Sequence, residues 1–304
     1  MIRIAILVPV FALLLTGCTG ENADVAFQPG DKVEVVATTG MVADVAREVG
    51  KGHVTVTALM RAGVDPHLYK ASADDVGKLQ GAHLILYNGK GLEGKMGDLF
   101  VKLARKRPVV AVTDEVPQER LLDDGQHYDP HIWFDLELWA ETPAVVAAAL
   151  AEIDPDHEAD YEANARAFRN EILKLHEKAK ADLATIPKER RVLITSHDAF
   201  RYFGRAYDVE VHGLQGISTV DEAGVKDVQR VVSLVVDRKI KAIFVETSVS
   251  PRTIEAVQSA VRARDHEVKI GGTLFSDAMG ESHPENTYLG MVRANVRVLM
   301  ESLK

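Results

Sequence analysis

The sequence predicts an α/β protein of two lobes, each with a parallel, mostly four-stranded sheet flanked by helices, joined by one long rigid backbone helix. Two sets of four short runs, rich in β-branched residues, have the length of strands. Segments with helical patterns lie between these runs, and strands that alternate with helices are typical of parallel sheets covered on both faces. Between the two sets lies the longest stretch of helical periodicity in the chain.

The strands of the first set are expected at 33–39, 54–60, 84–88 and 109–113, with helices at 41–49, 73–79, 96–105 and 136–153. The strands of the second set are expected at 191–196, 209–213, 242–246 and 269–274. This pattern places an N-terminal lobe at residues 32–156 and a C-terminal lobe at 188–304. The two sets show no matching sequence repeat, so they do not predict a solenoid.

Residues 157–187 are predicted to form the helix that joins the lobes. Its apolar positions recur at spacings of three and four: Tyr161, Ala165, Phe168, Ile172, Leu175, Ala179, Leu183 and Ile186. Pro187 ends the pattern. At 1.5 Å per residue, a helix of about 30 residues is about 45 Å long, the length of a whole lobe. Such a helix disfavours a large hinge; the alternative is a long core helix within a single domain.

The first 17 residues are predicted to be a lipoprotein signal peptide. The apolar run that follows Arg3 is about 12 residues long, whereas a membrane span needs about 20. It ends in Leu15-Thr16-Gly17-Cys18, which resembles a lipobox and implies lipid attachment to Cys18. The alternative is an ordinary signal peptide followed by an incidental cysteine. Residues 18–31 are polar and rich in turn-formers, and we interpret them as a lipid-anchored flexible tether.

Composition narrows the kinds of ligand. The formal net charge of −9 argues against a nucleic-acid partner and is compatible with small cations. Cys18 is the only cysteine, so thiolate metal sites and internal disulfides are excluded. Any metal is therefore held by nitrogen and oxygen.

Four polar residues in turn-forming or strand-ending segments are the candidate metal ligands: His67, His131, His197 and Asp277. They lie far apart in sequence, so only the folded chain could bring them together. Three imidazoles and one carboxylate fill the coordination sphere of a borderline divalent metal and leave little room for a reactive water. This favours holding a metal over using it in catalysis. For any one of these histidines alone, the alternative is a satisfied polar residue in a turn.

Two further residues are candidates for a supporting role near the metal ligands. Glu246 ends a predicted strand and is expected to brace a ligand histidine through its second ring nitrogen, with a capping or solvent-facing carboxylate as the alternative. His127 is expected to be a solvated loop residue, with transient metal capture as the alternative.

Several short motifs occur in an order that resembles a known family. They are Thr38-Thr39-Gly40-Met41, Gly63-Val64-Asp65-Pro66-His67-Leu68-Tyr69, Asn88-Gly89-Lys90-Gly91-Leu92-Glu93, Asp129-Pro130-His131-Ile132-Trp133, Thr195-Ser196-His197-Asp198-Ala199-Phe200 and Phe275-Ser276-Asp277. Together they resemble the TroA-like (cluster A-I) metal-specific solute-binding lipoproteins of zinc and manganese ABC importers. The resemblance covers nearly all of the chain after residue 17.

The resemblance implies a function and a place. It implies that His67, His131, His197 and Asp277 bind a divalent ion between the lobes, two ligands from each lobe. It further implies a monomeric extracytoplasmic receptor, anchored to the membrane by lipid at Cys18, that delivers the ion to an ABC permease.

The metal is expected to be Zn²⁺, because manganese-leaning members of the family tend to have a glutamate where this chain has His197. Mn²⁺ (or Fe²⁺) is the alternative, since three-histidine members accept more than one metal. The segment 114–128 also lacks the long histidine-rich loop of many zinc receptors; it carries only His127.

Two other classes of function are less compatible with the sequence. A metal-dependent hydrolase needs an open coordination position and a general base; Asp198, next to His197, is a candidate base, but four protein ligands leave little space for a substrate. An adhesin role has no supporting feature in the sequence. We therefore expect a binding protein and no enzyme.

Overall fold

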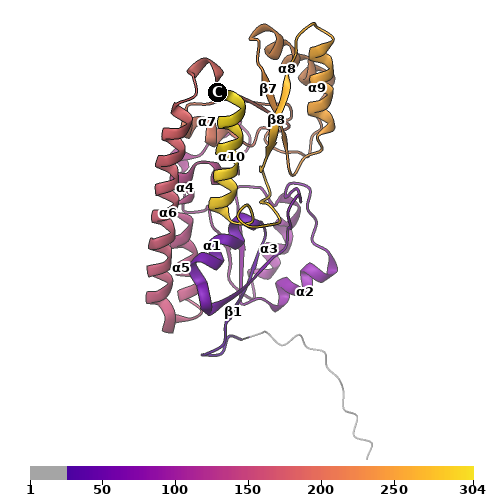
Figure 1. Cartoon of the computed structure of the whole chain (residues 1–304). Coiled ribbons are helices and arrows are strands. Elements are labelled where there is room, and N and C mark those ends of the chain that lie inside the picture. The colour runs from indigo at the N-terminus through magenta and orange to yellow at the C-terminus, as the bar shows by residue number, and fades with distance from the viewer. Residues whose placement is uncertain (1–25) are drawn as a thin grey trace, which may run out of the picture.

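The structure is a computed structural model and describes residues 26–304. The predicted signal peptide 1–17, Cys18 and the first part of the predicted 18–31 tether lie outside the described residues. The chain forms two α/β lobes stacked along one long helix, α6, Glu158–Ala184 (Figure 1). Among the helices of residues 26–304, none has both the length and the apolar character needed to cross a bilayer.

The N-terminal lobe contains a four-stranded parallel sheet in the order β2-β1-β3-β4. Its strands are β1 Val33–Ala37, β2 Val54–Ala58, β3 Leu84–Tyr87 and β4 Val109–Ala111. Successive strand residues face opposite layers: Val35 packs into the core shared with α1, whereas Val36 packs with α2 and α3. These helices are α1 Gly40–Gly50, α2 Ala73–Gly81 and α3 Gly97–Leu103. The sheet is therefore covered on both faces, as the alternation predicted.

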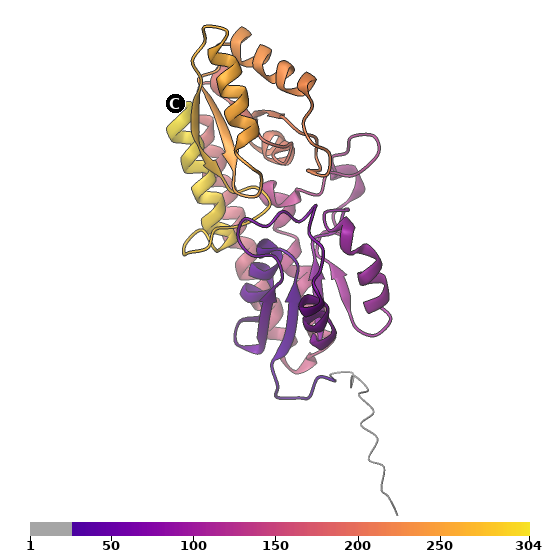
Figure 2. The same ribbon diagram turned by 90° about the vertical axis from the view of Figure 1, so that its right-hand side faces the viewer.

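The C-terminal lobe differs from the expectation in how its strands pair. β5 Val192–Thr195 pairs with β6 Glu210–Gly213, and β7 Ala242–Glu246 pairs with β8 Lys269–Leu274, all in parallel. β5 and β7 lie next to each other, but the two pairs do not join into one hydrogen-bonded sheet. A register shift at Ile243/Phe244 interrupts the second pair, and such irregularities increase strand twist. Helices α7 Arg201–Tyr207, α8 Val225–Asp237, α9 Arg252–Arg262 and α10 Tyr288–Leu303 flank these strands (Figure 2).

The helix predicted at 136–153 is wrong as a single element. It is divided into α4 Leu136–Trp139 and α5 Thr142–Ala151. Pro143 has no N–H to donate, and its ring would clash with the carbonyl of Trp139 one turn earlier in a continuous helix. The Thr142 hydroxyl donates to that Trp139 carbonyl at 2.8 Å, so the break leaves the carbonyl satisfied.

The long helix α6 confirms the predicted apolar stripe. Seven of the expected positions within it are buried: Tyr161, Ala165, Phe168, Ile172, Leu175, Ala179 and Leu183. His176 is buried beside them, with its Nδ1 3.2 Å from the hydroxyl of Tyr207. This face packs on α1, α4 and α5 below and on α7 and α10 above (Figure 1). One continuous core therefore runs through both lobes along α6.

Within residues 26–304, short 3₁₀ segments complete the helices: Lys51–His53, Gly94–Met96, Gln118–Arg120, Ile132–Phe134, Pro155–His157 and Lys188–Arg190. The loops that matter for function follow the carboxyl ends of strands. These are the loops after β2, β4, β5 and β8, and in open α/β folds such ends meet where ligands bind.

Candidate metal centre

The structure brings all four predicted ligands together. His67 lies in the loop after β2, His131 in the loop after β4, His197 directly after β5 and Asp277 after β8. Each offers one donor atom, and these atoms all lie within 4.8 Å of one another. All four residues are buried, and His67, at 5% exposure, is the most accessible of them. Two come from each lobe, so the cluster lies where the lobes meet.

The spacing of the donor atoms suits one small cation. His67 Nε2 lies 3.3 Å from His131 Nε2, and His197 Nε2 lies 3.2 Å from Asp277 Oδ2. His131 Nε2 lies 3.4 Å from Asp277 Oδ1, and His67 Nε2 lies 3.6 Å from Asp277 Oδ2. A tetrahedral ion with bonds of about 2.0–2.1 Å has ligand-to-ligand edges of about 3.3–3.4 Å.

Several of these buried polar atoms have no other partner. Neither carboxylate oxygen of Asp277 accepts a hydrogen bond, and Nε2 of His197 makes none. Buried polar groups normally have hydrogen-bond partners, and a cation between these atoms would satisfy all of them. Three imidazoles and one carboxylate are the donor types that hold borderline divalent metals.

Two of the imidazoles are braced on the ring nitrogen that faces away from the cluster. Glu246 Oε2 lies 2.6 Å from Nδ1 of His197, and its Oε1 accepts a hydrogen bond from the His197 backbone N–H at 2.8 Å. Asp129 Oδ1 lies 2.7 Å from Nδ1 of His131 and also accepts from the His131 backbone N–H. A proton held on Nδ1 leaves Nε2 free to face a cation.

Glu246 therefore stands where the sequence predicted a brace, whereas Asp129 was missed. The signal for Asp129 was present, because a carboxylate two residues before the histidine occurs in both Asp-Pro-His segments. In the other segment, Asp65 Oδ1 accepts a hydrogen bond from the backbone N–H of His67 at 2.9 Å. The aspartates thus orient the histidines directly, in addition to the stiffening that proline supplies.

The charges of the cluster are strongly coupled. Burial alone would lower the pKa of His131, but the carboxylates of Asp129 and Asp277 outweigh it and raise the pKa to about 9. Burial would also lower the pKa of His197. The carboxylates of Glu246 and Asp277 outweigh burial and raise this pKa well above its usual value. The histidines in turn hold the pKa of Asp277 well below its usual range despite burial. Asp277 is thus a carboxylate, ready to accept a cation.

His67 behaves differently from the other two histidines. Burial lowers its pKa to about 3, because the attraction of Asp277 is too weak to offset desolvation and the neighbouring imidazoles. In the described part of the chain, no carboxylate lies against its Nδ1. His67 is therefore a neutral imidazole whose Nε2 faces the other donors.

Buried hydrogen bonds hold the loops that carry the ligands. The Asn88 amide donates to the carbonyl of Pro130 at 3.0 Å, next to His131. Trp133 packs its ring against His131 and donates from Nε1 to the carbonyl of Ser276 at 3.1 Å. Trp133 thus links the segments of His131 and Asp277 across the two lobes.

The remaining candidates are not part of the cluster. His127 is exposed in the loop after β4. Asp198, the nominee for a general base, has its carboxylate 3.8 Å from the guanidinium of Arg201.

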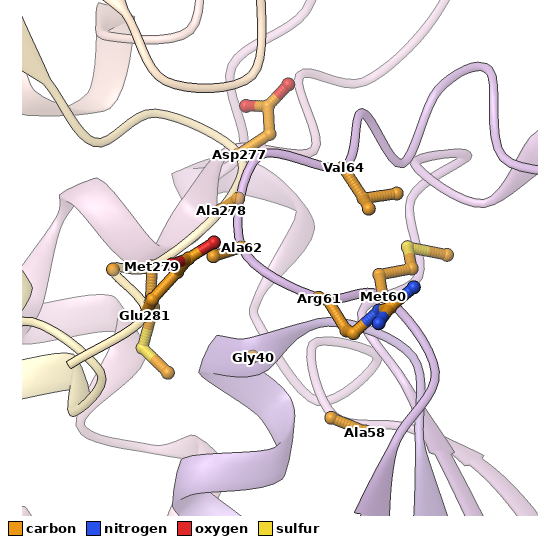
Figure 3. Close-up of a pocket in the computed structure, with 11 residues that line it drawn as sticks. Gly40, Ala58, Met60, Arg61, Ala62, Val64, Asp277, Ala278, Met279 and Glu281 are labelled. Carbon is orange, nitrogen blue, oxygen red and sulfur yellow. The ribbon is translucent and has the colours of Figure 1, made fainter.

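A pocket of about 330 Å³ borders the cluster between the segments 58–64 and 277–281. Figure 3 shows Met60, Arg61 and Met279 around it, with the Asp277 carboxylate pointing away from Gly40 and Ala58. The pocket therefore lies behind the Asp277 loop and does not contain the converging donor atoms.

Two α/β lobes on one stiff helix, with a buried three-histidine, one-aspartate cluster between them, define a metal-specific solute-binding protein. The chain belongs to the ZnuA family, described as zinc-uptake complex component A, periplasmic, whose sequence model matches residues 35–302.

Two curated relatives align with almost the whole chain. The zinc-binding protein TroA of Treponema pallidum is 44% identical over 306 residues, covering 100% of this chain and 99% of its own. The manganese-binding lipoprotein MntA of Bacillus subtilis is 42% identical over 307 residues, covering 99% and 98%. The solved structure of periplasmic zinc-binding TroA from T. pallidum superposes with a TM-score of 0.88 at 44% identity, covering 90% of this chain and 99% of that one.

Proposed function

We propose that this protein captures a divalent metal ion outside the cytoplasmic membrane and delivers it to the permease of an ABC importer. The observation that carries the proposal is the convergence of His67, His131, His197 and Asp277 from both lobes onto one buried point. Four protein donors leave no room for a reacting substrate, so the ion is the cargo and the protein is no enzyme. Because each lobe supplies two ligands, release requires the two halves of the site to separate.

The proposed cargo is Zn²⁺. Three imidazoles suit zinc, and neighbouring donor atoms 3.2–3.6 Å apart are close to the ligand spacing of a tetrahedral ion. Mn²⁺ (or Fe²⁺) is the second candidate, for a specific reason. Both oxygens of Asp277 face histidine nitrogens, Oδ1 toward His131 and Oδ2 toward His197, so this carboxylate is placed to bind through both atoms. That would give the five-coordinate, harder shell that manganese prefers. The relatives named for zinc and for manganese are almost equally similar to this chain.

The proposal includes the place of action. Relatives are described as lipoproteins or periplasmic proteins, which supports the interpretation of Cys18 as the lipid-bearing residue after removal of residues 1–17. The protein would act as a monomer tethered to the outer face of the membrane, within reach of its permease.

Competitive titration tests the proposal. The chain lacking its signal peptide and lipid is stripped with a chelator and titrated with Zn²⁺ and Mn²⁺, alone and against each other. One equivalent of Zn²⁺ that excess Mn²⁺ does not displace supports the zinc receptor. Preferential binding of one equivalent of Mn²⁺ would support the receptor function with manganese, not zinc, as the transported ion.

Two variants locate the binding. His197→Ala should weaken binding at least a hundredfold, because it removes one of four donors, whereas His127→Ala is the matched control and should bind like the parent. Unchanged affinity in His197→Ala would mean that the second lobe does not contribute, and no stoichiometric metal would reject the proposal.

A further inference from the structure

One hydrogen bond crosses between the lobes beside the cluster without involving any of the four candidate ligands. The Thr219 hydroxyl donates to Asp65 Oδ2 at 2.6 Å. Thr219 belongs to the loop between β6 and α8 of the C-terminal lobe, and Asp65 to the loop between β2 and α2 of the N-terminal lobe. Thr219 is buried, although Ser218 and Val220 on either side of it are exposed. Its side chain therefore faces inward, toward the site.

The Asp65 carboxylate serves two purposes at once. Its Oδ2 binds Thr219, while its Oδ1 accepts the backbone N–H of His67 at 2.9 Å. The position of the His67 backbone is thus coupled through one carboxylate to the opposite lobe. A hydrogen bond to a charged group is stronger than one between neutral groups, so this contact is suited to hold the His67 loop against the opposite lobe.

Each of the other ligands is held by a residue of its own lobe. His131 is braced by Asp129, and His197 by Glu246. The segment before Asp277 is fixed by Asn295, whose Oδ1 accepts the N–H of Phe275 and whose Nδ2 donates to its carbonyl. His67 is also the ligand nearest solvent, since the following residue, Leu68, is 50% exposed.

The hydrogen bonds between the lobes are distributed unevenly. One group joins α7 to the segment 120–135, for example Tyr202 to Asp129 and Arg205 to Asp135. Others join Trp133 to Ser276 and Tyr288 to Asp44. Among the described residues, the hydrogen bond of Thr219 is the one that ties the 59–72 loop, which carries His67, to the C-terminal lobe. The His67 side of the site is therefore the side with the fewest restraints.

From this asymmetry we propose that Thr219 is a positioning residue whose hydroxyl latches the His67 loop closed over the bound ion. The inference rests on the proposed metal-receptor function and adds that the ion is lost on the His67 side. Breaking the latch leaves all four donors in place but lets His67 withdraw more often. The latch therefore slows dissociation and leaves the number of bound ions unchanged.

Stopped-flow release of Zn²⁺ into excess chromophoric chelator tests the latch on the metal-loaded protein. Thr219→Val replaces the hydroxyl with a methyl of similar volume, and we expect it to raise the dissociation rate about tenfold, as loss of a hydrogen bond worth about 1.5 kcal/mol would. Thr219→Ser keeps the hydroxyl and should stay within about twofold of the parent. Thr55→Val makes the same change at an exposed position of β2 and should leave the dissociation rate unchanged.

The outcomes separate the latch from the function on which it rests. One equivalent of zinc in every variant, with fast release in Thr219→Val alone, supports the latch. One equivalent with parental release in Thr219→Val overturns the latch and leaves the receptor intact. Equally fast release in Thr219→Val and Thr219→Ser also overturns it, because the hydroxyl would then be irrelevant. Absence of stoichiometric zinc in the parent protein overturns the receptor function and the latch together.

Discussion

At the scale of single residues, the three imidazoles of the cluster differ in what lies against their second ring nitrogen. Asp129 and Glu246 lie against His131 and His197, and they raise the pKa of both above the usual value. His67 has no such carboxylate among the described residues, and burial lowers its pKa. An incoming metal ion must therefore displace protons from two ligands and none from the third.

This difference predicts pH-dependent binding. The pKa of His131 is raised to about 9, so lowering the pH favours the proton over the metal throughout the range below it. We expect the affinity for Zn²⁺ to be more than tenfold lower at pH 5.5 than at pH 7.5, measured by competitive titration. Equal affinities would contradict an imidazole coordination shell.

Protonation of His131 also stabilises the metal-free fold below the ordinary pKa of 6.5, and this contribution is lost as the pH rises through about 9.

Replacing the brace of His197 should weaken binding without removing a ligand. Glu246→Gln keeps the shape of the side chain but removes the charge beside Nδ1 of His197. Partners of this kind are typically worth about 10–100-fold in metal affinity, and we expect a loss of that size by calorimetry. Glu255→Gln, on the exposed face of α9, is the matched control. Parental affinity in Glu246→Gln would show that Glu246 only holds the backbone N–H of His197.

The donors were predictable from sequence, and most of their supports were not. His67, His131, His197 and Asp277 carry family motifs, and Glu246 was found because it ends a strand. The contact of Asn88 with the Pro130 carbonyl depends on how two loops distant in sequence fold against each other. Loop geometry of this kind is not encoded in any periodicity that a sequence pattern can display.

At the scale of elements, α10 of the C-terminal lobe is attached by its first residue to α1 of the N-terminal lobe. Asp44 Oδ2 accepts the backbone N–H of Tyr288 at 2.8 Å. Burial raises the pKa of Asp44 to about 6, although the Tyr288 N–H acts in the opposite direction. A raised carboxyl pKa means that the folded protein binds this proton more tightly than the unfolded chain.

The Asp44 contact predicts a stabilising substitution. The contribution of the protonated carboxyl is complete below the ordinary pKa of about 3.8 and is lost as the pH rises through about 6. Asp44→Asn keeps an oxygen for the Tyr288 N–H and removes the buried charge, so we expect about 1–3 kcal/mol of added stability at pH 8 by urea unfolding. The gain should vanish near pH 4, and Asp221→Asn in an exposed loop should show neither effect. A variant less stable than the parent at pH 8 would contradict this account.

The sequence predicted the boundaries of the strands closely, but it did not predict which strands of the C-terminal lobe pair. Predicted strands agree with the observed ones to within one or two residues. The break between α4 and α5 was readable in principle from Pro143. Which strands of the C-terminal lobe share hydrogen bonds depends on contacts distant in sequence, and the residue pattern alone did not reveal the two separate pairs.

At the scale of the whole molecule, the lobes share one core and one helix. The buried face of α6 belongs to a cluster that extends from β1 to α10. Side chains of α7 add hydrogen bonds across the lobes, such as that from the Tyr202 hydroxyl to the Asp129 carbonyl at 3.1 Å. A wide hinge motion would break this core, so opening should be local and small.

The shared core predicts that metal stabilises the protein without reshaping it. Zinc at about 1,000 times its dissociation constant should add about 4 kcal/mol of stability, which raises the melting temperature by several degrees. The radius of gyration from small-angle scattering should change by less than about 1 Å, in contrast to a hinged receptor. Two separated unfolding transitions, or a large expansion on metal removal, would contradict a shared core.

The central claim is that four side chains from two lobes bind one ion, and anomalous X-ray diffraction tests it most directly. Crystals of the zinc-loaded protein would be measured on both sides of the zinc absorption edge. We predict a single strong anomalous peak about 2.0–2.2 Å from Nε2 of His67, His131 and His197 and from at least one oxygen of Asp277. A peak elsewhere, or one bound by the ligands of a single lobe, would contradict the account.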